Sequence, residues 1–267
     1  MVRPAPLVVE IPHAGTVIPA DVSDSLLATR HDVERDADPY VDELFDDAPT
    51  VGAVLLAARC SRYVIDLNRF EEDVDRAAVP DAPGGRNGFP RGIVWSETSD
   101  GRRALRAPLT LAEFTQRLDR YYRPYHRALA TEIAALHERF GYVIVVSAHS
   151  MPSSSRTLLN DRPLRRADIV PGSRGRTTAS ASVIDTVDAH FRAAGLSVRH
   201  DDPYRGGATT IRWGRPEDGI HAIQIELNRA LYMDETTLQR REQQMHWLRG
   251  LCTDLLRRLV ALDLGRR

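Results

Sequence analysis

The chain has 267 residues, a hydrophobic content of 42%, a charged content of 27% and a formal net charge of −1. This balance is typical of a globular protein with a large core, and it gives no electrostatic reason to expect nucleic acid or a membrane surface as a partner. All 36 basic residues are arginine, which excludes Schiff-base and pyridoxal phosphate chemistry through a lysine and a Walker-type phosphate site.

The first predicted strand covers residues 7–11, Leu-Val-Val-Glu-Ile. Pro12 ends it because proline has no N–H to donate, His13 follows, and Gly15 is expected to turn the backbone with a positive φ. Residues 22–48 are acidic and broadly helical. Pro39 disfavours helix at the residue before it, so we expect one helix to end there and the next to open at Pro39.

Residues 51–58 are apolar enough to predict a further strand, and residues 63–67 predict another short strand or a strand end. Residues 71–108 are rich in Pro, Gly, Asp and Arg, which predicts a long loop or a small hairpin insertion. A long amphipathic helix is predicted over residues 110–140, with a break near Pro124. Thr110 and Glu113 fit a capping box at its start, and Gly141 suits its end.

The apolar strand predicted at 142–147 leads into His149, which repeats the order of strand and histidine seen at His13. Residues 151–178 form a second irregular insertion. Beyond it we expect a helix at 180–194, strands at 196–199 and 219–226, and a terminal helix at 233–262. This order predicts one α/β domain over residues 1–267, a three-layer sandwich with a mostly parallel or mixed sheet.

Two histidines at equivalent strand ends suggest a metal site at one edge of the sheet. A nearby carboxylate would complete a zinc set of two histidines and one acid, with a position left open for water. Asp38, Asp36 and Asp32 are the candidates, because they follow the first strand. The alternative is that the histidines are structural and the acids complement a helix N-terminus.

A polar cluster follows the predicted strand at 63–67. Arg62 precedes that strand, Asp66 lies within it, and Asn68 and Arg69 come directly after it. Arginine and asparagine together can grip a substrate carboxylate, while Asp66 is better suited to orient a ligand or an arginine. A structural Asp–Arg pair is the alternative.

Glu226 is a carboxylate inside an otherwise apolar strand, where charged groups are rare without a purpose or a partner. Beside an activated water it could act as general base and then general acid, and a buried salt bridge is the alternative. The loop Arg205-Gly206-Gly207 combines a positive charge with glycines that allow close backbone approach, which makes it a weaker candidate for substrate binding.

Five motifs together resemble the N-formylglutamate amidohydrolase (deformylase) family. They stand in the family's order and are Ile11-Pro12-His13-Ala14-Gly15, Asp36-Ala37-Asp38, Ser61-Arg62-Tyr63-Val64-Ile65-Asp66-Leu67-Asn68-Arg69, Ala148-His149-Ser150 and Gln224-Ile225-Glu226-Leu227. That family is similar in fold to zinc carboxypeptidases and aspartoacylases. The resemblance implies a zinc amidohydrolase that cleaves an N-acyl amino acid, with N-formyl-L-glutamate giving glutamate and formate in histidine degradation.

The resemblance also implies roles for single residues. His13, His149 and Asp38 match the ligands of one Zn²⁺ per chain, and Asp36 competes with Asp38 or, like Asp66, orients the ligands. Glu226 matches the glutamate that activates water, and Arg62 is expected at the oxyanion. The residues expected to hold the substrate are Asn68, Arg69, Arg205 and Gly207.

Two other functions remain open at this point. One is a zinc amidase or peptidase that acts on another N-acyl amino acid. The other is a degenerate member that binds an acidic amino acid without turnover. No apolar stretch approaches the roughly 20 residues that span a bilayer, and no signal peptide is recognisable, so we expect a cytoplasmic enzyme. The expected partner is the small-molecule substrate alone, with the oligomeric state open.

Overall fold

The structure is a computed structural model that describes residues 2–83, 91–159 and 162–265. Two compact units divide the chain. The first unit comprises Met1–Ile11, Tyr40–Leu56 and Glu132–Arg267, and the second comprises Pro12–Pro39 and Ala57–Thr131. Parts of both predicted insertions, residues 84–90 and 160–161, lie outside the described residues.

The first unit is built on a five-stranded sheet of order β2-β1-β3-β7-β6. Its strands are β1 (Leu7–Ile11), β2 (Val54–Ala57), β3 (Val143–Met151), β6 (Ile169–Gly172) and β7 (Ile220–Asn228). β3 runs parallel to both β1 and β7, whereas β6 is antiparallel to β7. Every residue of β1, β3 and β7 is buried, as expected for strands covered on both faces. A separate two-stranded ribbon joins β4 (Ser154–Leu159) to β5 (Arg162–Arg165).

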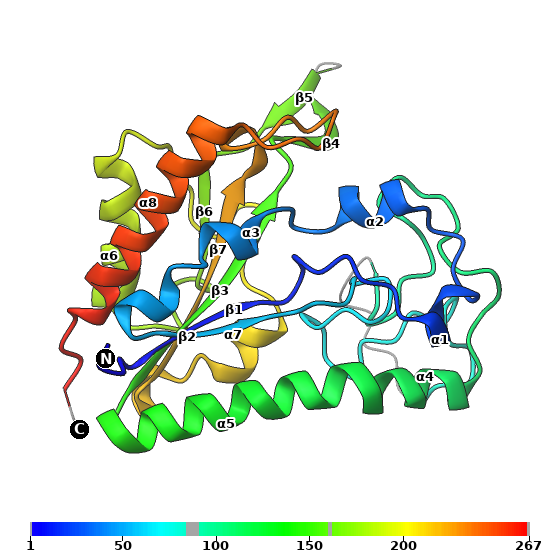
Figure 1. Ribbon diagram of the computed structural model, residues 1–267, viewed down its shortest axis with the longest axis horizontal. Coiled ribbons are helices and arrows are strands. Elements are labelled where there is room, and N and C mark those ends of the chain that lie inside the picture. Colours follow the sequence, from blue (N-terminus) through cyan, green and yellow to red (C-terminus); the bar gives the residue numbers. More distant parts are fainter. Residues whose placement is uncertain (1, 84–90, 160–161, 266–267) are drawn as a thin grey trace. The chain divides into compact units, whose positions relative to one another are not determined.

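Helices lie on both sides of this sheet, which confirms the predicted α/β class with a mixed sheet. They are α3 (Val41–Leu44), α6 (Ala181–Ala193), α7 (Ala208–Trp213) and α8 (Glu242–Val260). Figure 1 shows α6 and α8 on one side of the strands and α7 on the other, and α7 contacts β3 and β7. Short 3₁₀ turns lie at Ala48–Val51, Pro216–Asp218 and Arg229–Leu231. Among the described residues, none of the helices combines the length and the hydrophobicity that a membrane span requires.

The second unit has its own hydrophobic core, which includes Tyr63, Trp95 and Tyr122. Its helices are α1 (Ala20–Ser23), α2 (Arg30–Asp36), α4 (Leu111–Arg117), a π-helical turn (Leu118–Tyr122) and the start of α5 (Arg123–Phe140). The capping box of Thr110 and Glu113 forms as predicted, and the predicted break near Pro124 is the π-helical turn just before it. Residues of the predicted insertion at 71–108, such as Ile93, are part of this core.

The strand predicted at 63–67 is wrong, because these residues lie in turns and irregular backbone. Residues 63–67 are mostly apolar because they are buried. Their backbone groups form hydrogen bonds to residues outside any strand. Arg117 donates to the carbonyl oxygens of Tyr63 and Val64, and the N–H of Asp66 donates to the Ile93 carbonyl. These bonds satisfy the backbone without a neighbouring strand.

Other element boundaries also differ from the prediction. The strand expected at 196–199 is reduced to a bridge between Val198 and Ile169. The terminal helix begins at Glu242 instead of residue 233, because the side chain of Asp234 accepts the N–H groups of Thr236 and Thr237 and favours a turn there. The helix expected to open at Pro39 begins at Val41.

The predicted positive φ of Gly15 is also wrong, since Gly15 is not among the residues with positive φ. Gly15 is needed for space instead: a Cβ atom at this position would lie 2.4 Å from the carbonyl carbon of Arg59. The neighbouring backbone bonds, from the Val17 N–H to the Arg59 carbonyl and from the Ser61 N–H to the Val17 carbonyl, hold these segments together.

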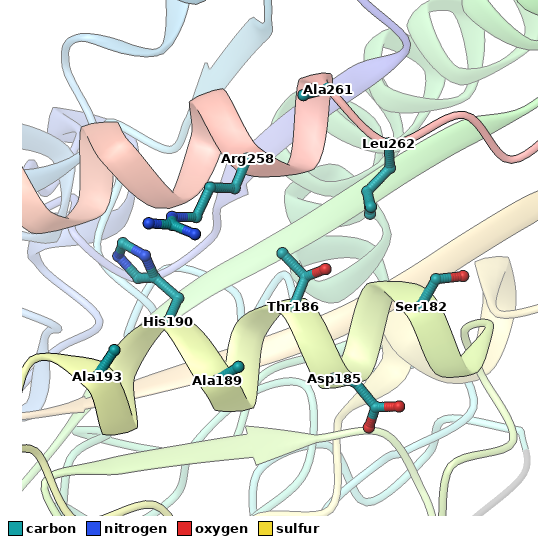
Figure 2. A pocket seen from close by; sticks show the side chains of 9 residues that line it. All are labelled: Ser182, Asp185, Thr186, Ala189, His190, Ala193, Arg258, Ala261 and Leu262. Atoms are coloured by element: carbon teal, nitrogen blue, oxygen red, sulfur yellow. The ribbon is translucent and has the colours of Figure 1, made fainter.

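A groove lies between α6 and α8 in the first unit. Its lining is largely apolar and includes Ala189, Ala193 and Leu262, and Figure 2 shows His190 and Arg258 facing each other there. None of the residues that the sequence singles out lines this groove. The candidate site is therefore elsewhere.

Candidate functional site

His13 lies two residues beyond β1 and its ring is held on both sides by carboxylates of the second unit. Nε2 is 2.7 Å from Oδ1 of Asp66, and Nδ1 is 3.6 Å from Oδ2 of Asp38. All three residues are buried. The N–H of Asp38 also donates to the His13 carbonyl at 2.9 Å, which fixes the spacing of the two residues.

Asp66 accepts several hydrogen bonds, one of them from His13. Oδ1 accepts hydrogen bonds from His13 and from the Asn68 N–H, and Oδ2 accepts from Arg62 and Trp95. Burial alone would raise the pKa of Asp66, but the positive charge of Arg62, followed by His13 and Arg69, holds the pKa well below its usual value. An ionised carboxylate can only accept, so Nε2 of His13 is the donor in this hydrogen bond.

The orientation of His13 fits a metal ligand. Metal-binding histidines commonly donate their other N–H to a carboxylate, which fixes the tautomer. Two ligand atoms at about 2 Å from a zinc ion, at a tetrahedral angle, lie about 3.4 Å apart. The separation of 3.6 Å between Nδ1 of His13 and Oδ2 of Asp38 is close to this value. The donor chemistry of this pair therefore suits Zn²⁺.

Asp36 has different surroundings. Its carboxylate accepts hydrogen bonds from the Tyr63 hydroxyl, from the N–H and hydroxyl of Ser99, and from Arg35. Burial raises the pKa of Asp36, but the bonds from Arg35, Ser99 and Tyr63 outweigh it and lower the pKa to about 2. Asp32 accepts from its own cap residue Thr29 and from Arg102. The carboxylates of Asp36 and Asp32 therefore form hydrogen bonds that stabilise the second unit.

Arg62 is half-buried and contacts Asp66 and Trp95. Its Nε and Nη2 donate to Oδ2 of Asp66, its Nη1 donates to the Asp36 carbonyl, and the guanidinium lies 4.4 Å from the centre of the Trp95 ring. Arg91 contacts the same ring at 5.0 Å. The donors of Arg62 are thus directed at the Asp66 carboxylate and at the backbone of Asp36.

Asn68 and Arg69 follow Asp66 in the same turn. Asn68 is buried, while the Arg69 guanidinium donates to the carbonyl oxygens of Asn68 and Arg91. Burial lowers the pKa of Arg69, and the negative charge of Asp66 offsets this only in part. The Tyr122 hydroxyl donates to the Arg69 carbonyl and holds the turn in place.

His149 belongs to the first unit and lies within β3, because that strand continues to Met151 instead of ending at residue 147. Oγ of Ser147 lies 3.1 Å from Nε2 of His149 and donates to Glu10 of β1 at 2.7 Å. His149 pairs in register with Glu226 of β7. The two predicted site residues of the first unit are therefore neighbours at the carboxyl end of parallel strands, where ligands bind in α/β sheets.

Glu226 is buried and hydrogen-bonded to Gln224, for which the sequence predicted no role. Nε2 of Gln224 donates to Oε1 of Glu226 at 2.7 Å, and Oε1 of Gln224 accepts the N–H of Gly207 at 2.9 Å. Gly207, predicted to approach the substrate, thus directs its N–H at Gln224. Arg205 of the same loop is exposed, and its carbonyl accepts the N–H of Arg174.

Alternation along the strands could have identified the missed residues. Ser147 and His149, like Gln224 and Glu226, are two positions apart in a strand, so each pair shares one face of the sheet. A polar residue two positions before a candidate catalytic residue in a buried strand is a usable signal. Trp95 left no such signal, because nothing in the sequence links position 95 to position 66.

The chain is similar to known proteins that share one family name. The sequence profile of the family described as N-formylglutamate amidohydrolase matches residues 5–233. The chain is 32% identical over 237 residues to an N-formylglutamate deformylase of Pseudomonas aeruginosa, with 86% of this chain and 83% of that protein covered. A protein of the same name from Pseudomonas putida is 30% identical over 238 residues, with the same coverage.

Solved structures give the same result. The crystal structure of N-formylglutamate amidohydrolase from Ralstonia eutropha superimposes with a TM-score of 0.86 at 35% identity, covering 97% of this chain and 93% of that one. A protein of Agrobacterium tumefaciens shares the fold, with a TM-score of 0.63 at 23% identity over 94% of this chain and 89% of that one.

Proposed function

The chain belongs to the N-formylglutamate amidohydrolase family, and we propose that it hydrolyses N-formyl-L-glutamate to L-glutamate and formate with one zinc ion. Its relatives identify it as an amidohydrolase that acts on a linear amide. The names of the two Pseudomonas relatives support the substrate. Cys60 and Cys252 are free thiols, which suits the reducing cytoplasm that we propose as its location.

The proposed zinc ligands are His13, Asp38 and His149. Each is buried and offers a ligand atom that zinc accepts. The single observation that carries the proposal is the orientation of His13, whose Nε2–H is bound by Asp66 while Nδ1 faces Asp38. β1 and β3 are parallel neighbours, with Glu10 opposite Ser147, so the chain leaves both strands at the same edge of the sheet.

When bound, zinc would act as a Lewis acid that polarises the formyl carbonyl and acidifies a water molecule. Glu226 accepts the proton of the attacking water and delivers it to the leaving amine nitrogen. Asn68 and Arg69 bind the carboxylate of the substrate and orient the amide. Arg62 donates to Asp66, which supports a role in positioning Asp66 and, through Asp66, His13. This role is in addition to the expected role of Arg62 at the oxyanion.

The test is the zinc content of the purified protein, measured together with formate release from N-formyl-L-glutamate with and without a chelator. We expect about one zinc per chain, because the described residues offer one such set of ligands. We also expect formate release that the chelator abolishes and added zinc restores. Zinc without formate release would redirect the substrate search to other N-acyl amino acids. A protein that neither binds zinc nor releases formate would refute the proposal.

A matched pair of variants tests the choice of carboxylate ligand. Asp38→Asn should lose zinc and activity, because an amide is a poor substitute for the anionic oxygen. Asp36→Asn should keep zinc but unfold more easily, because Asp36 is bound by Tyr63, Ser99 and Arg35. Loss of zinc from the Asp36 variant alone would reverse the assignment.

A further inference from the structure

Gln224 lies between Glu226 and the Arg205-Gly206-Gly207 loop, and its side chain is hydrogen-bonded to both. Gln224 and Glu226 share one face of β7, and only 4% and 5% of their surfaces are exposed. The 2.7 Å bond from Nε2 of Gln224 to Glu226 and the 2.9 Å bond from the Gly207 N–H to Oε1 of Gln224 make a continuous chain.

The direction of this chain is fixed by its far end. A backbone N–H can only donate, so the group of Gln224 that faces Gly207 must be the carbonyl oxygen. The NH₂ group of Gln224 is then left facing Glu226, where it can only donate. Turning the amide over would set an N–H against the Gly207 N–H and an oxygen against the Glu226 carboxylate.

The loop that supplies the Gly207 N–H is itself held in place. Gly172 of β6 is the register partner of Gln224, so their Cβ directions share a face of the sheet. A Cβ atom on Gly172 would lie 2.7 Å from the nitrogen of Gly206, which shows that the loop occupies the space beside Gln224. Gly206 has a φ of +100°, and Thr210 donates to the Gly207 carbonyl at 2.9 Å.

We propose that Gln224 is the positioning residue of Glu226, and that the Arg-Gly-Gly loop serves to orient Gln224 through the Gly207 N–H. The inference rests on the proposed role of Glu226 as proton acceptor. The hydrogen bond from Gln224 holds Oε1 of Glu226 and so limits rotation of the carboxylate. The position of Oε2, the other carboxylate oxygen, is thereby fixed for proton transfer. The loop motif thereby acts on the reaction without touching the substrate.

The kinetic test uses Gln224→Met, which keeps the length of the side chain and removes both hydrogen bonds. We expect kcat to fall about 10- to 100-fold, with KM and zinc content unchanged, because a displacement of about 1 Å at a catalytic group has an effect of this size. The exposed Gln243→Met on α8 is the matched control and should leave kcat unchanged. In a Glu226→Gln background, Gln224→Met should cause no further loss, because both changes act on the same group. An unchanged kcat, or a full further loss in the double variant, would overturn the proposal.

A second measurement does not depend on turnover. The side-chain NH₂ signals of Gln224 in a nitrogen-15 spectrum should shift when Glu226→Ala removes their acceptor, and they should not shift in the Gln243→Met control. If the Gln224 signals do not shift in the Glu226→Ala variant, the proposal is overturned, even where the wild-type enzyme is fully active. If the wild type released no formate while the signals shifted as expected, the proposed function would fail and the positioning contact would stand.

Discussion

Nε2 of His13 donates to Oδ1 of Asp66 across 2.7 Å, and this bond distinguishes the two nitrogens of the ring. With Nε2 occupied, only Nδ1 is available as a ligand atom, and it faces Asp38. We therefore expect residues that hold Asp66 in place to act on metal binding although they do not touch the metal.

Trp95 is one such residue, since its Nε1–H donates to Oδ2 of Asp66 at 3.2 Å. Trp95→Phe removes this donor and keeps an aromatic ring beside Arg62. We expect the dissociation constant for zinc to rise about 10-fold, at the low end of the effect of residues that support ligands. Competition with a chelator of known affinity measures it. Trp247→Phe changes an exposed tryptophan of α8 and is the control. Equal affinity in the two variants would show that the Trp95 contact has no part in metal binding.

Glu226→Gln should lower kcat strongly and leave zinc bound. The amide keeps the shape of the side chain but cannot accept the proton of water, and the loss of a general base typically lowers kcat about 10²- to 10⁴-fold. The introduced amide would also face the NH₂ group of Gln224, so the spectrum of Gln224 should change in this variant. Metal analysis and formate release on the same sample check both parts. A Glu226→Gln variant with full activity would remove Glu226 from the mechanism.

The strands that carry the site were predictable because each is a continuous buried run. β1 and β7 begin and end within two residues of their predicted bounds, and β3 only continues further than expected. The apolar run at 63–67 failed because burial and strand formation leave the same pattern in a sequence. Its hydrogen bonds go to Arg117 and Ile93, and such distant partners cannot be read from local composition.

The candidate site shows the same limit. Its chemistry-bearing residues stand at or near strand ends and in one polar turn, so their types and order could be recognised. The contacts that orient them join positions far apart in the chain: His13 with Asp66, Asp66 with Trp95, and Gln224 with Gly207. Spacing also could not separate Asp36 from Asp38, since the difference lies in the Tyr63 and Ser99 bonds to Asp36.

Gly15→Ala should destabilise the protein because the added Cβ meets the backbone of Arg59, which cannot move aside as a side chain could. Overpacking of this kind typically costs about 1–3 kcal/mol. Gly250→Ala is the control: Gly250 lies within helix α8 with nothing within 4 Å of its Cβ position, and the change should stabilise the protein by up to about 1 kcal/mol. Denaturant unfolding of both variants gives the two free energies. Equal changes in the two variants would contradict the close approach of Arg59.

Protonation of His190 should lower the stability of the protein on acidification. This effect is independent of the candidate metal site. Its ring is buried beside Leu251, whose carbonyl lies 2.9 Å from Nε2. Burial lowers the pKa of His190; the Leu251 carbonyl and Asp254 oppose this shift, and Arg258 adds to it. The unfolded chain titrates near its ordinary pKa of about 6.5. Below that pH the unfolded state binds a proton that the folded state does not, so the free energy of unfolding falls as the pH falls.

The matched variant is His190→Gln, which keeps an N–H donor for the Leu251 carbonyl and does not titrate. Both proteins share every other ionisable group, so the difference between their pH profiles isolates His190. We expect the wild type to lose more free energy of unfolding than the variant between about pH 7.5 and pH 5.5, a range that brackets the ordinary pKa of histidine, measured by denaturant titration. Parallel profiles would show that His190 has the same proton affinity in the folded and unfolded chain, and a steeper profile for the variant would reverse the sign of the predicted shift.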